Sequence, residues 1–328
     1  MKKVLVTGSC GLVGSEAVKY YLEKGCKVTG IDNNMRELFF GTSVLENQVE
    51  HPYYTHHNID IADCGHVLLA FKPDIIVHCA AQPSHDWSAK DPVTDFNINA
   101  VSTLYLLEIC RLHLPEVVFI FASTNKVYGD NPNKLPLNEL KHRYEANILG
   151  IDETMSVDNC IHSMFGVSKL AADMACQEYG KNYGLKTGIF RCGCITGGRH
   201  AGAELHGFLS YVAKCKRDGL IYKIHGYKGK QVRDQIHAYD LVTAFDSFAE
   251  EPRAGEVYNM GGGHKCNISV LEAMKIFHVP YEYHDQARVG DHIWWVSDRT
   301  KFEKHYPDWK CKYSLENILD DLLKCKRV

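Results

Sequence analysis

The sequence predicts an α/β protein built on a doubly wound parallel sheet, with a smaller C-terminal lobe. In the first half, apolar strand-like runs alternate with helix-like segments, which is typical of parallel strands joined by crossover helices. The runs are apolar on both faces, as expected for a sheet that helices cover on both sides. A glycine-rich loop directly follows the first run, where such folds begin their first helix.

The expected elements follow in chain order. Helix-like patterns cover 12–24, 97–113 and 165–182, and glycine-rich turns crowd 193–203 and 259–267. We therefore expect a dinucleotide-binding domain over 1–190 and a mainly substrate-binding lobe over 191–328, interleaved with the sheet. The expected strands are KKVLVTG (2–8), KVTGID (27–32), DIIVHCAA (74–81), VVFIFAST (117–124) and KTGIFRCG (186–193).

Composition excludes several functional classes. The net charge is −3, so no basic field attracts nucleic acid. No apolar run reaches the roughly 20 residues that a membrane span needs. The thirteen cysteines are scattered without C-x-x-C pairs, which favours free thiols in a reducing cytoplasm over disulfides or a metal site. We expect a cytoplasmic protein with no membrane contact and no bound metal.

The loop TGSCGLVG (7–14) predicts a dinucleotide site. Gly8, Gly11 and Gly14 have G-x-x-G-x-x-G spacing between a strand and a helix. Gly8 allows a tight turn, Gly11 leaves room for a pyrophosphate, and Gly14 lets the helix pack closely. Leu12 and Val13 begin this helix, where backbone N–H groups favour an anion.

A carboxylate about 20 residues further on favours NAD over NADP. Asp32 ends the second strand and is followed by Asn33. It can accept hydrogen bonds from a ribose hydroxyl, and it repels a 2′-phosphate. Asp60 and Ile61, in NIDIAD, are predicted to lie beside the adenine, although a turn carboxylate explains Asp60 as well.

These motifs together resemble the extended short-chain dehydrogenase/reductase superfamily, with its Rossmann-type NAD-binding domain. CAAQPS (79–84) resembles the strand end beneath the cofactor and adds Ala80 and Ala81, and Asn99 matches a structural asparagine. FASTNKVYGD (121–130) matches the strand that carries the catalytic Ser/Thr, here Thr124. HSMFGVSK (162–169) supplies the active-site Lys169, and the resemblance implies that Lys169 and Asn99 also contact the cofactor. In GKQVRDQIHAYDLV (229–242), the resemblance places Arg233 at a diphosphate.

Within the superfamily, STNKVYG and GKQVRD are most similar to CDP-tyvelose (CDP-paratose) 2-epimerases. The resemblance implies that NAD takes a hydride from a sugar carbon, that a keto-sugar forms, and that the hydride returns to the opposite face. In 4,6-dehydratases an Asp-Glu pair follows the threonine, whereas here Asn125 and Lys126 follow Thr124, so elimination of water is not expected. A UDP-sugar 4-epimerase is the alternative reaction.

One position departs from the family motif Y-x-x-x-K. Phe165 stands where the family has a tyrosine that transfers a proton, and a phenyl ring has no hydroxyl. Cys194 is the leading replacement, because nearby positive charge lowers a thiol's pKa. Alternatives for the base are His85, Asp86, His162 and Lys126. His85, His162, Lys126 and Cys194 are also expected to bind substrate.

Two further interpretations of Phe165 stay open. It is either an engineered change that traps a substrate complex, or the mark of a protein that binds NAD or a nucleotide sugar without turnover.

The remaining predicted substrate contacts lie in the second half. The resemblance places HAGAELHGFLSY (200–211) along the nucleotide, with Glu204 and His206 as contacts. Arg233 has a planar fork suited to diphosphate oxygens, although a structural ion pair explains it too. Arg288 resembles a second diphosphate arginine. Because superfamily members pair helices equivalent to 97–113 and 165–182, we expect a homodimer.

Overall fold

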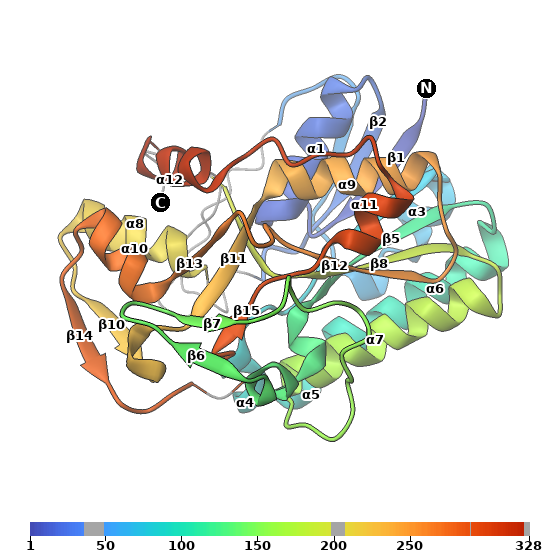
Figure 1. Cartoon of the computed structure of the whole chain (residues 1–328). Helices are drawn as coiled ribbons and strands as arrows, with labels where there is room; N and C mark the ends of the chain where they lie inside the picture. The colour runs from blue at the N-terminus through green and yellow to red at the C-terminus, as the bar shows by residue number, and fades with distance from the viewer. Residues whose placement is uncertain (36–48, 198–206, 289, 325–328) are drawn as a thin grey trace. The chain divides into compact units, whose positions relative to one another are not determined.

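The computed structural model describes residues 1–35, 49–197, 207–288 and 290–324 (Figure 1). They form two compact units, each assembled from stretches that are distant in sequence. Unit 1 consists of Met1–Thr124, Met164–Arg191 and Leu241–Tyr258, and unit 2 of Asn125–Ser163, Cys192–Asp240 and Asn259–Val328.

A seven-stranded sheet with the order β12-β8-β5-β4-β1-β2-β3 forms the centre of unit 1. The pairs that join β5, β4, β1, β2 and β3 are all parallel. This confirms the predicted doubly wound sheet, and all five expected strands form within one to three residues of their predicted ends. The strands are β1 (Lys3–Thr7), β2 (Lys27–Ile31), β3 (Tyr54–His57), β4 (Ile75–His78), β5 (Val118–Thr124), β8 (Lys186–Cys192) and β12 (Glu256–Met260).

Helices cover this sheet, and α6 and α7 lie side by side (Figure 1). The predicted helix over 97–113 starts as a π-helical turn and continues as α6. Apolar side chains from β1, β4, β5, α3, α6 and α7 share one hydrophobic core. The helical segments are α1 (Leu12–Glu23), η1 (Ile61–Asp63), α3 (Gly65–Phe71), α4 (His85–Lys90), α5 (Pro92–Phe96), η2 (Asn97–Val101), α6 (Ser102–His113), α7 (Met164–Lys181) and α9 (Ala238–Glu250).

Unit 2 is built around β11, which pairs with β13, β15 and β9. Two further strand pairs are β10 with β14 and β6 with β7. The strands are β6 (Leu137–Glu139), β7 (Tyr144–Ala146), β9 (Cys194–Thr196), β10 (Tyr222–His225), β11 (Val232–His237), β13 (Asn267–Ser269), β14 (Tyr281–His284) and β15 (Trp294–Trp295). The helical segments are η3 (Asn125–Tyr128), η4 (Asn131–Lys134), α8 (Phe208–Asp218), η5 (Tyr227–Gly229), α10 (Val270–Phe277), α11 (Thr300–His305) and α12 (Leu315–Lys324).

Local sequence explains several of these elements. Ser269 and Glu272 form a reciprocal capping box at the start of α10, which satisfies two backbone donors. Trp295 is fully buried and stacks on Tyr128, whose hydroxyl donates to Asn259 Oδ1 at 2.8 Å. These aromatic side chains therefore form part of the packed interior of unit 2. Within the described ranges, every helix is too short or too polar to traverse a lipid bilayer.

Candidate functional site

The glycine-rich loop connects β1 to α1 and leaves little room for a side chain at its three glycine positions. Gly8 has φ +65°, and a Cβ there would lie 2.6 Å from the Ala80 nitrogen. A Cβ on Gly14 would lie 2.0 Å from the Gly8 oxygen, and one on Gly11 3.3 Å from it. No side chain caps the start of α1 at Gly11, which precedes Leu12 and Val13. This bare cradle at a helix N-terminus fits the pyrophosphate of a dinucleotide.

Asp32 lies directly after β2 and faces the glycine-rich loop. Its carboxylate accepts hydrogen bonds from the backbone nitrogens of Cys10 (2.9 Å) and Asn34 (2.8 Å). Asn33 Nδ2 donates to Asp60 Oδ2 at 2.7 Å. The structure therefore brings two pairs of predicted cofactor contacts together: Asp32 with the loop, and Asn33 with Asp60.

The other predicted cofactor contacts have different surroundings. Ile61 is buried in the hydrophobic core of unit 1, because it opens the short helix η1 that packs there. Its side chain therefore faces the protein interior, and its contact with the cofactor stays a prediction. Ala80 is half-buried, and its backbone nitrogen donates to Thr7 Oγ1 at 3.2 Å, while Ala81 is half-buried one residue further on.

Asn99 is buried and engaged by the protein itself. Its amide oxygen accepts from the Gln82 nitrogen at 2.9 Å, and its amide nitrogen donates to Ser168 Oγ at 3.0 Å and Asp95 Oδ1 at 3.2 Å. Asn99 therefore joins the strand end after β4 to helix α7. These hydrogen bonds hold neighbouring segments of unit 1 together, and the role of Asn99 toward the cofactor stays a prediction.

Lys169 is buried beside the carboxyl end of β5. Its ammonium donates to the Ala122 carbonyl oxygen at 2.8 Å and lies 4.0 Å from the centroid of the Phe121 ring. Thr124 is the last residue of β5. Phe165, one turn before Lys169, is 7% exposed. Unit 1 therefore holds the threonine, the lysine and the phenylalanine of the catalytic motif.

In unit 2, two positively charged side chains lie beside Asp291. The Arg233 guanidinium pairs with its carboxylate, and Lys126 Nζ lies 4.0 Å from it and donates to the Gly290 carbonyl oxygen at 2.9 Å. Burial lowers the pKa of Lys126 to about 8, with Arg233 and Arg288 contributing and Asp291 opposing. Although burial alone raises it, Arg233 and Lys126 bring the pKa of Asp291 below its ordinary value. Arg233 therefore forms an ion pair with Asp291, one of the two roles that its sequence context allowed.

Cys194 begins β9, opposite Gln235 of β11. Burial raises the pKa of its thiol to about 11, and Arg233 and Lys126 oppose this only in part. Within unit 2, desolvation therefore outweighs these two charges, and the catalytic role of Cys194 stays a prediction.

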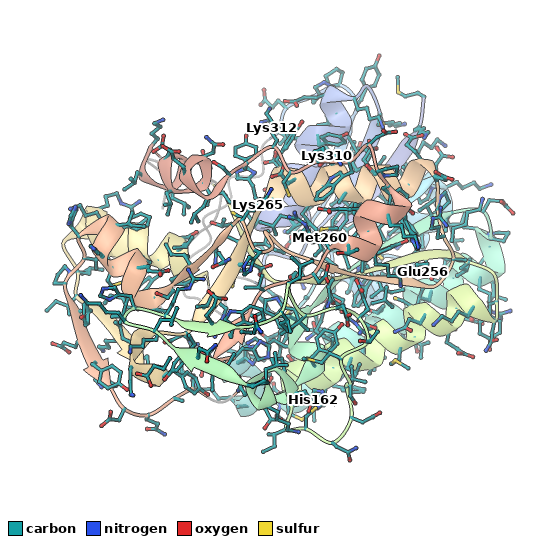
Figure 2. All side chains as sticks on the ribbon, viewed as in Figure 1. His162, Glu256, Met260, Lys265, Lys310 and Lys312 are labelled. Atoms are coloured by element: carbon teal, nitrogen blue, oxygen red, sulfur yellow. The ribbon has the colours of Figure 1, made fainter. Side chains whose placement is uncertain are left out.

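His162 lies on the loop that leads into α7 (Figure 2). Its Nε2 is 2.9 Å from the Val127 carbonyl oxygen, to which it donates, and both ring nitrogens are 3.7 Å from Cys160 Sγ. These contacts hold His162 to η3. The two other predicted nucleotide contacts, Glu204 and His206, lie outside the described residues.

Several residues that organise the site were not singled out by the sequence. Asn133 holds the 291–293 segment, since its amide donates to the Asp291 carbonyl oxygen at 3.0 Å and accepts from the Ile293 nitrogen at 2.7 Å. In unit 1, Gln82 and Asp95 join Asn99 in a buried network. No local motif marks these side chains, because their partners come from distant parts of the chain.

A metal centre has no candidate ligand set in the part of the chain that the structure covers. Among the residues that the structure describes, no three His, Cys, Asp or Glu side chains lie close enough together to bind a metal ion.

Comparison with known proteins adds to this geometry. Residues 4–261 match the model of the "NAD dependent epimerase/dehydratase family". The chain is 32% identical to CDP-paratose 2-epimerase from Salmonella typhi over 288 residues, which are 84% of this chain and 83% of that protein. It is 26% identical to dTDP-glucose 4,6-dehydratase from Salmonella typhimurium over 321 residues, 93% of this chain and 84% of that one. The structure of UDP-glucose 4-epimerase from Thermotoga maritima, determined with UDP-glucose, aligns with a TM-score of 0.80 at 25% identity over 98% of this chain and 97% of that chain.

Proposed function

Because the chain belongs to the NAD dependent epimerase/dehydratase family, we propose that it inverts C2 of a CDP-linked dideoxyhexose. The similarity to the Salmonella typhi 2-epimerase is the observation that carries this assignment. The residues after Thr124 support epimerisation over dehydration. Asn125 and Lys126 begin η3, where elimination of water would need an acid and a base of the carboxylate kind.

The cofactor is NAD, and unit 1 has the groups to hold it. The pyrophosphate would lie on the backbone of Gly8, Gly11 and Gly14, and the ribose hydroxyls would meet the Asp32 carboxylate. Bound NAD supplies a nicotinamide ring that accepts a hydride and returns it. The buried Lys169 ammonium adds a fixed positive charge beside the end of β5.

Each unit by itself contains predicted contacts to the nucleotide sugar. Thr124 offers a hydroxyl that can hydrogen-bond a sugar oxygen while the carbon is oxidised. In unit 2, Lys126 and Arg233 are predicted to bind the substrate, with Arg233 at the diphosphate. Arg233 is already oriented by Asp291, so its guanidinium would bind phosphate oxygens without first losing much side-chain freedom.

The proposal is tested with CDP-paratose that carries deuterium at C2. Purified protein with NAD is expected to produce the C2 epimer with the deuterium retained, because the same hydride leaves and returns. The product is identified by NMR. Loss of the deuterium to water would contradict a hydride mechanism. Turnover of UDP-glucose at C4 in a parallel sample, with CDP-paratose unchanged, would favour the 4-epimerase alternative that the Thermotoga maritima structure represents.

The protein is expected to form a homodimer through α6 and α7. These neighbouring helices expose large apolar side chains, including Tyr105, Leu112 and Met174, and exposed apolar faces of this kind mark association sites. Light scattering should give twice the mass of one chain. Tyr105→Glu is expected to yield monomers, whereas Leu323→Glu, an equally drastic change at an exposed leucine of α12, should leave the dimer intact. A monomeric native protein would refute this prediction.

A further inference from the structure

The ring at the family's tyrosine position has a histidine against it. Phe165, in the first turn of α7, meets His85, the first residue of α4, edge to face. The two ring centroids are 4.9 Å apart and the rings are inclined at 66°. Both residues belong to unit 1, which also contains Thr124 and Lys169. An imidazole that can carry a proton therefore lies beside the ring that cannot.

His85 is held in this place by a buried hydrogen-bond network. Ser84 caps α4 by accepting from the Trp87 nitrogen at 3.2 Å. The Gln82 side chain accepts from the Ser84 nitrogen at 2.5 Å and donates to Asp95 Oδ1 at 2.7 Å. These hydrogen bonds therefore hold the backbone just before His85 in place.

The same network reaches α7 beside the catalytic motif. Ser168 Oγ donates to Asp95 Oδ2 at 2.5 Å and accepts from the Asn99 amide at 3.0 Å. Gln82, Asp95, Asn99 and Ser168 are all buried. A buried network whose members are satisfied holds its groups rigidly. The network therefore fixes α4 relative to the helix turn that bears Phe165 and Lys169.

The other candidates for the base have different surroundings. Burial raises the pKa of the Cys194 thiol to about 11. The His162 ring contacts Val127 and Cys160, and the Lys126 ammonium donates to the Gly290 carbonyl oxygen. Asp86 is exposed on the same helix as His85, but it is His85 that makes the ring contact with Phe165.

We propose that His85 is a catalytic residue that replaces the missing phenol as the proton-transfer group of the epimerase. This inference rests on the proposed function. When the sugar carbon gives up its hydride to oxidised NAD, the hydroxyl O–H bond breaks, a C=O bond forms, and the proton passes to the unprotonated nitrogen of the imidazole. When the hydride returns, the imidazolium gives the proton back to the oxygen. Protons and electrons balance over the cycle.

The first test uses the native protein with NAD and no sugar. The ring-proton NMR signals of His85 are followed against pH with and without NAD. Binding is expected to move the titration midpoint to lower pH, since the positively charged nicotinamide disfavours a second cation. Helices α5 and α7 pack against α4 and carry the buried ionisable groups Asp95, Lys169 and Asp173. These groups are present in both titrations, with NAD and without it. If the His85 titration midpoint is the same with and without NAD, His85 does not lie beside the nicotinamide.

The second test measures turnover of CDP-paratose. His85→Gln is expected to lower kcat by roughly 100- to 10,000-fold, the usual contribution of a positioned general base. NAD affinity and folding should be unchanged. Lys90→Gln, at the exposed end of the same helix, is the matched control and should retain native kcat.

A rescue variant separates catalysis from structure. His85→Gln combined with Phe165→Tyr restores a phenol beside Lys169 and should recover a large part of kcat. The acidic limb of its pH profile should lie at higher pH than that of the native protein, because the ordinary pKa of a phenol is higher than that of an imidazole.

The outcomes separate this inference from the proposed function. Full activity of His85→Gln, or an unshifted pH limb in the rescue variant, would disprove the role of His85. A native protein that turns over no sugar nucleotide would instead refute the proposed function, and the NMR titration would still decide where His85 lies.

Discussion

Replacing Asp173 by asparagine is expected to lower the free energy of unfolding by about 3–5 kcal/mol, because it leaves a buried guanidinium without its counter-charge. Asp173 Oδ1 accepts from Arg191 Nη2 at 2.8 Å, and Oδ2 accepts from Arg191 Nε at 3.0 Å. Both side chains are buried. Two parallel hydrogen bonds between a carboxylate and a guanidinium form the strongest ion-pair geometry available in proteins.

The same carboxylate also supports the end of β5. Ser123 Oγ donates to Asp173 Oδ2 at 2.7 Å, and Ser123 directly precedes Thr124. Asp173→Asn should therefore lower turnover as well as stability, because it loosens the strand end that carries the threonine.

Denaturant unfolding measures the effect, with Glu116→Gln as the control. Glu116 pairs with Lys186 at 2.8 Å, but its side chain is 86% exposed, and exposed pairs contribute about 1 kcal/mol or less. The double variant Asp173→Asn/Arg191→Met should recover part of the lost stability, since it removes the unpaired charge. If Asp173→Asn and Glu116→Gln lower the free energy of unfolding equally, burial does not make the Asp173–Arg191 pair more important than an exposed one.

Gly14→Ala is expected to weaken NAD binding by at least about tenfold, which corresponds to about 1.4 kcal/mol. A Cβ at this position would lie 2.0 Å from the Gly8 oxygen and 2.9 Å from the Ser9 Cα. Both are backbone atoms, so relief requires the loop to move, and such overpacking typically costs about 1–3 kcal/mol. The moved backbone is the part that would contact the pyrophosphate.

The control is Gly184→Ala, which strains the backbone without filling any space. Gly184 has φ +75°, and a Cβ there would meet no atom within 4 Å. This substitution should cost about 1–2 kcal/mol of stability through its left-handed conformation and leave NAD affinity unchanged. Calorimetric titration with NAD compares the two variants. Native affinity in Gly14→Ala would show that the glycine-rich loop is not the dinucleotide cradle.

Much of unit 1 was predictable because its signals are local. Buried parallel strands are apolar throughout, so the runs that became β1, β2, β4, β5 and β8 are visible without any partner. The strand β3 was missed because its sequence, YTHH, is short and polar. The glycine spacing and Asp32 were also readable, since a tight turn before a helix restricts residue type strongly.

Unit 2 was less predictable, because its strands are short and its contacts are distant in sequence. Arg233 and Asp291 are 58 residues apart in the chain, yet they form one ion pair. No periodicity or spacing marks such a pair. The surroundings of Cys194 were likewise not readable from the sequence, because only the folded structure shows that its thiol is buried near Arg233 and Lys126.

The sequence by itself determined five of the seven strands of the sheet, the glycine-rich loop, the positions of Thr124 and Lys169, and the absence of a hydroxyl at Phe165. These follow from residue types and short spacings, which act before any long-range contact forms. Only the tertiary structure decided that His85 lies against Phe165, and that Gln82, Asp95, Asn99 and Ser168 hold it there. The reason is physical: residues 80 positions apart along the chain become neighbours only when strands and helices pack, and the sequence carries no local signal of that proximity.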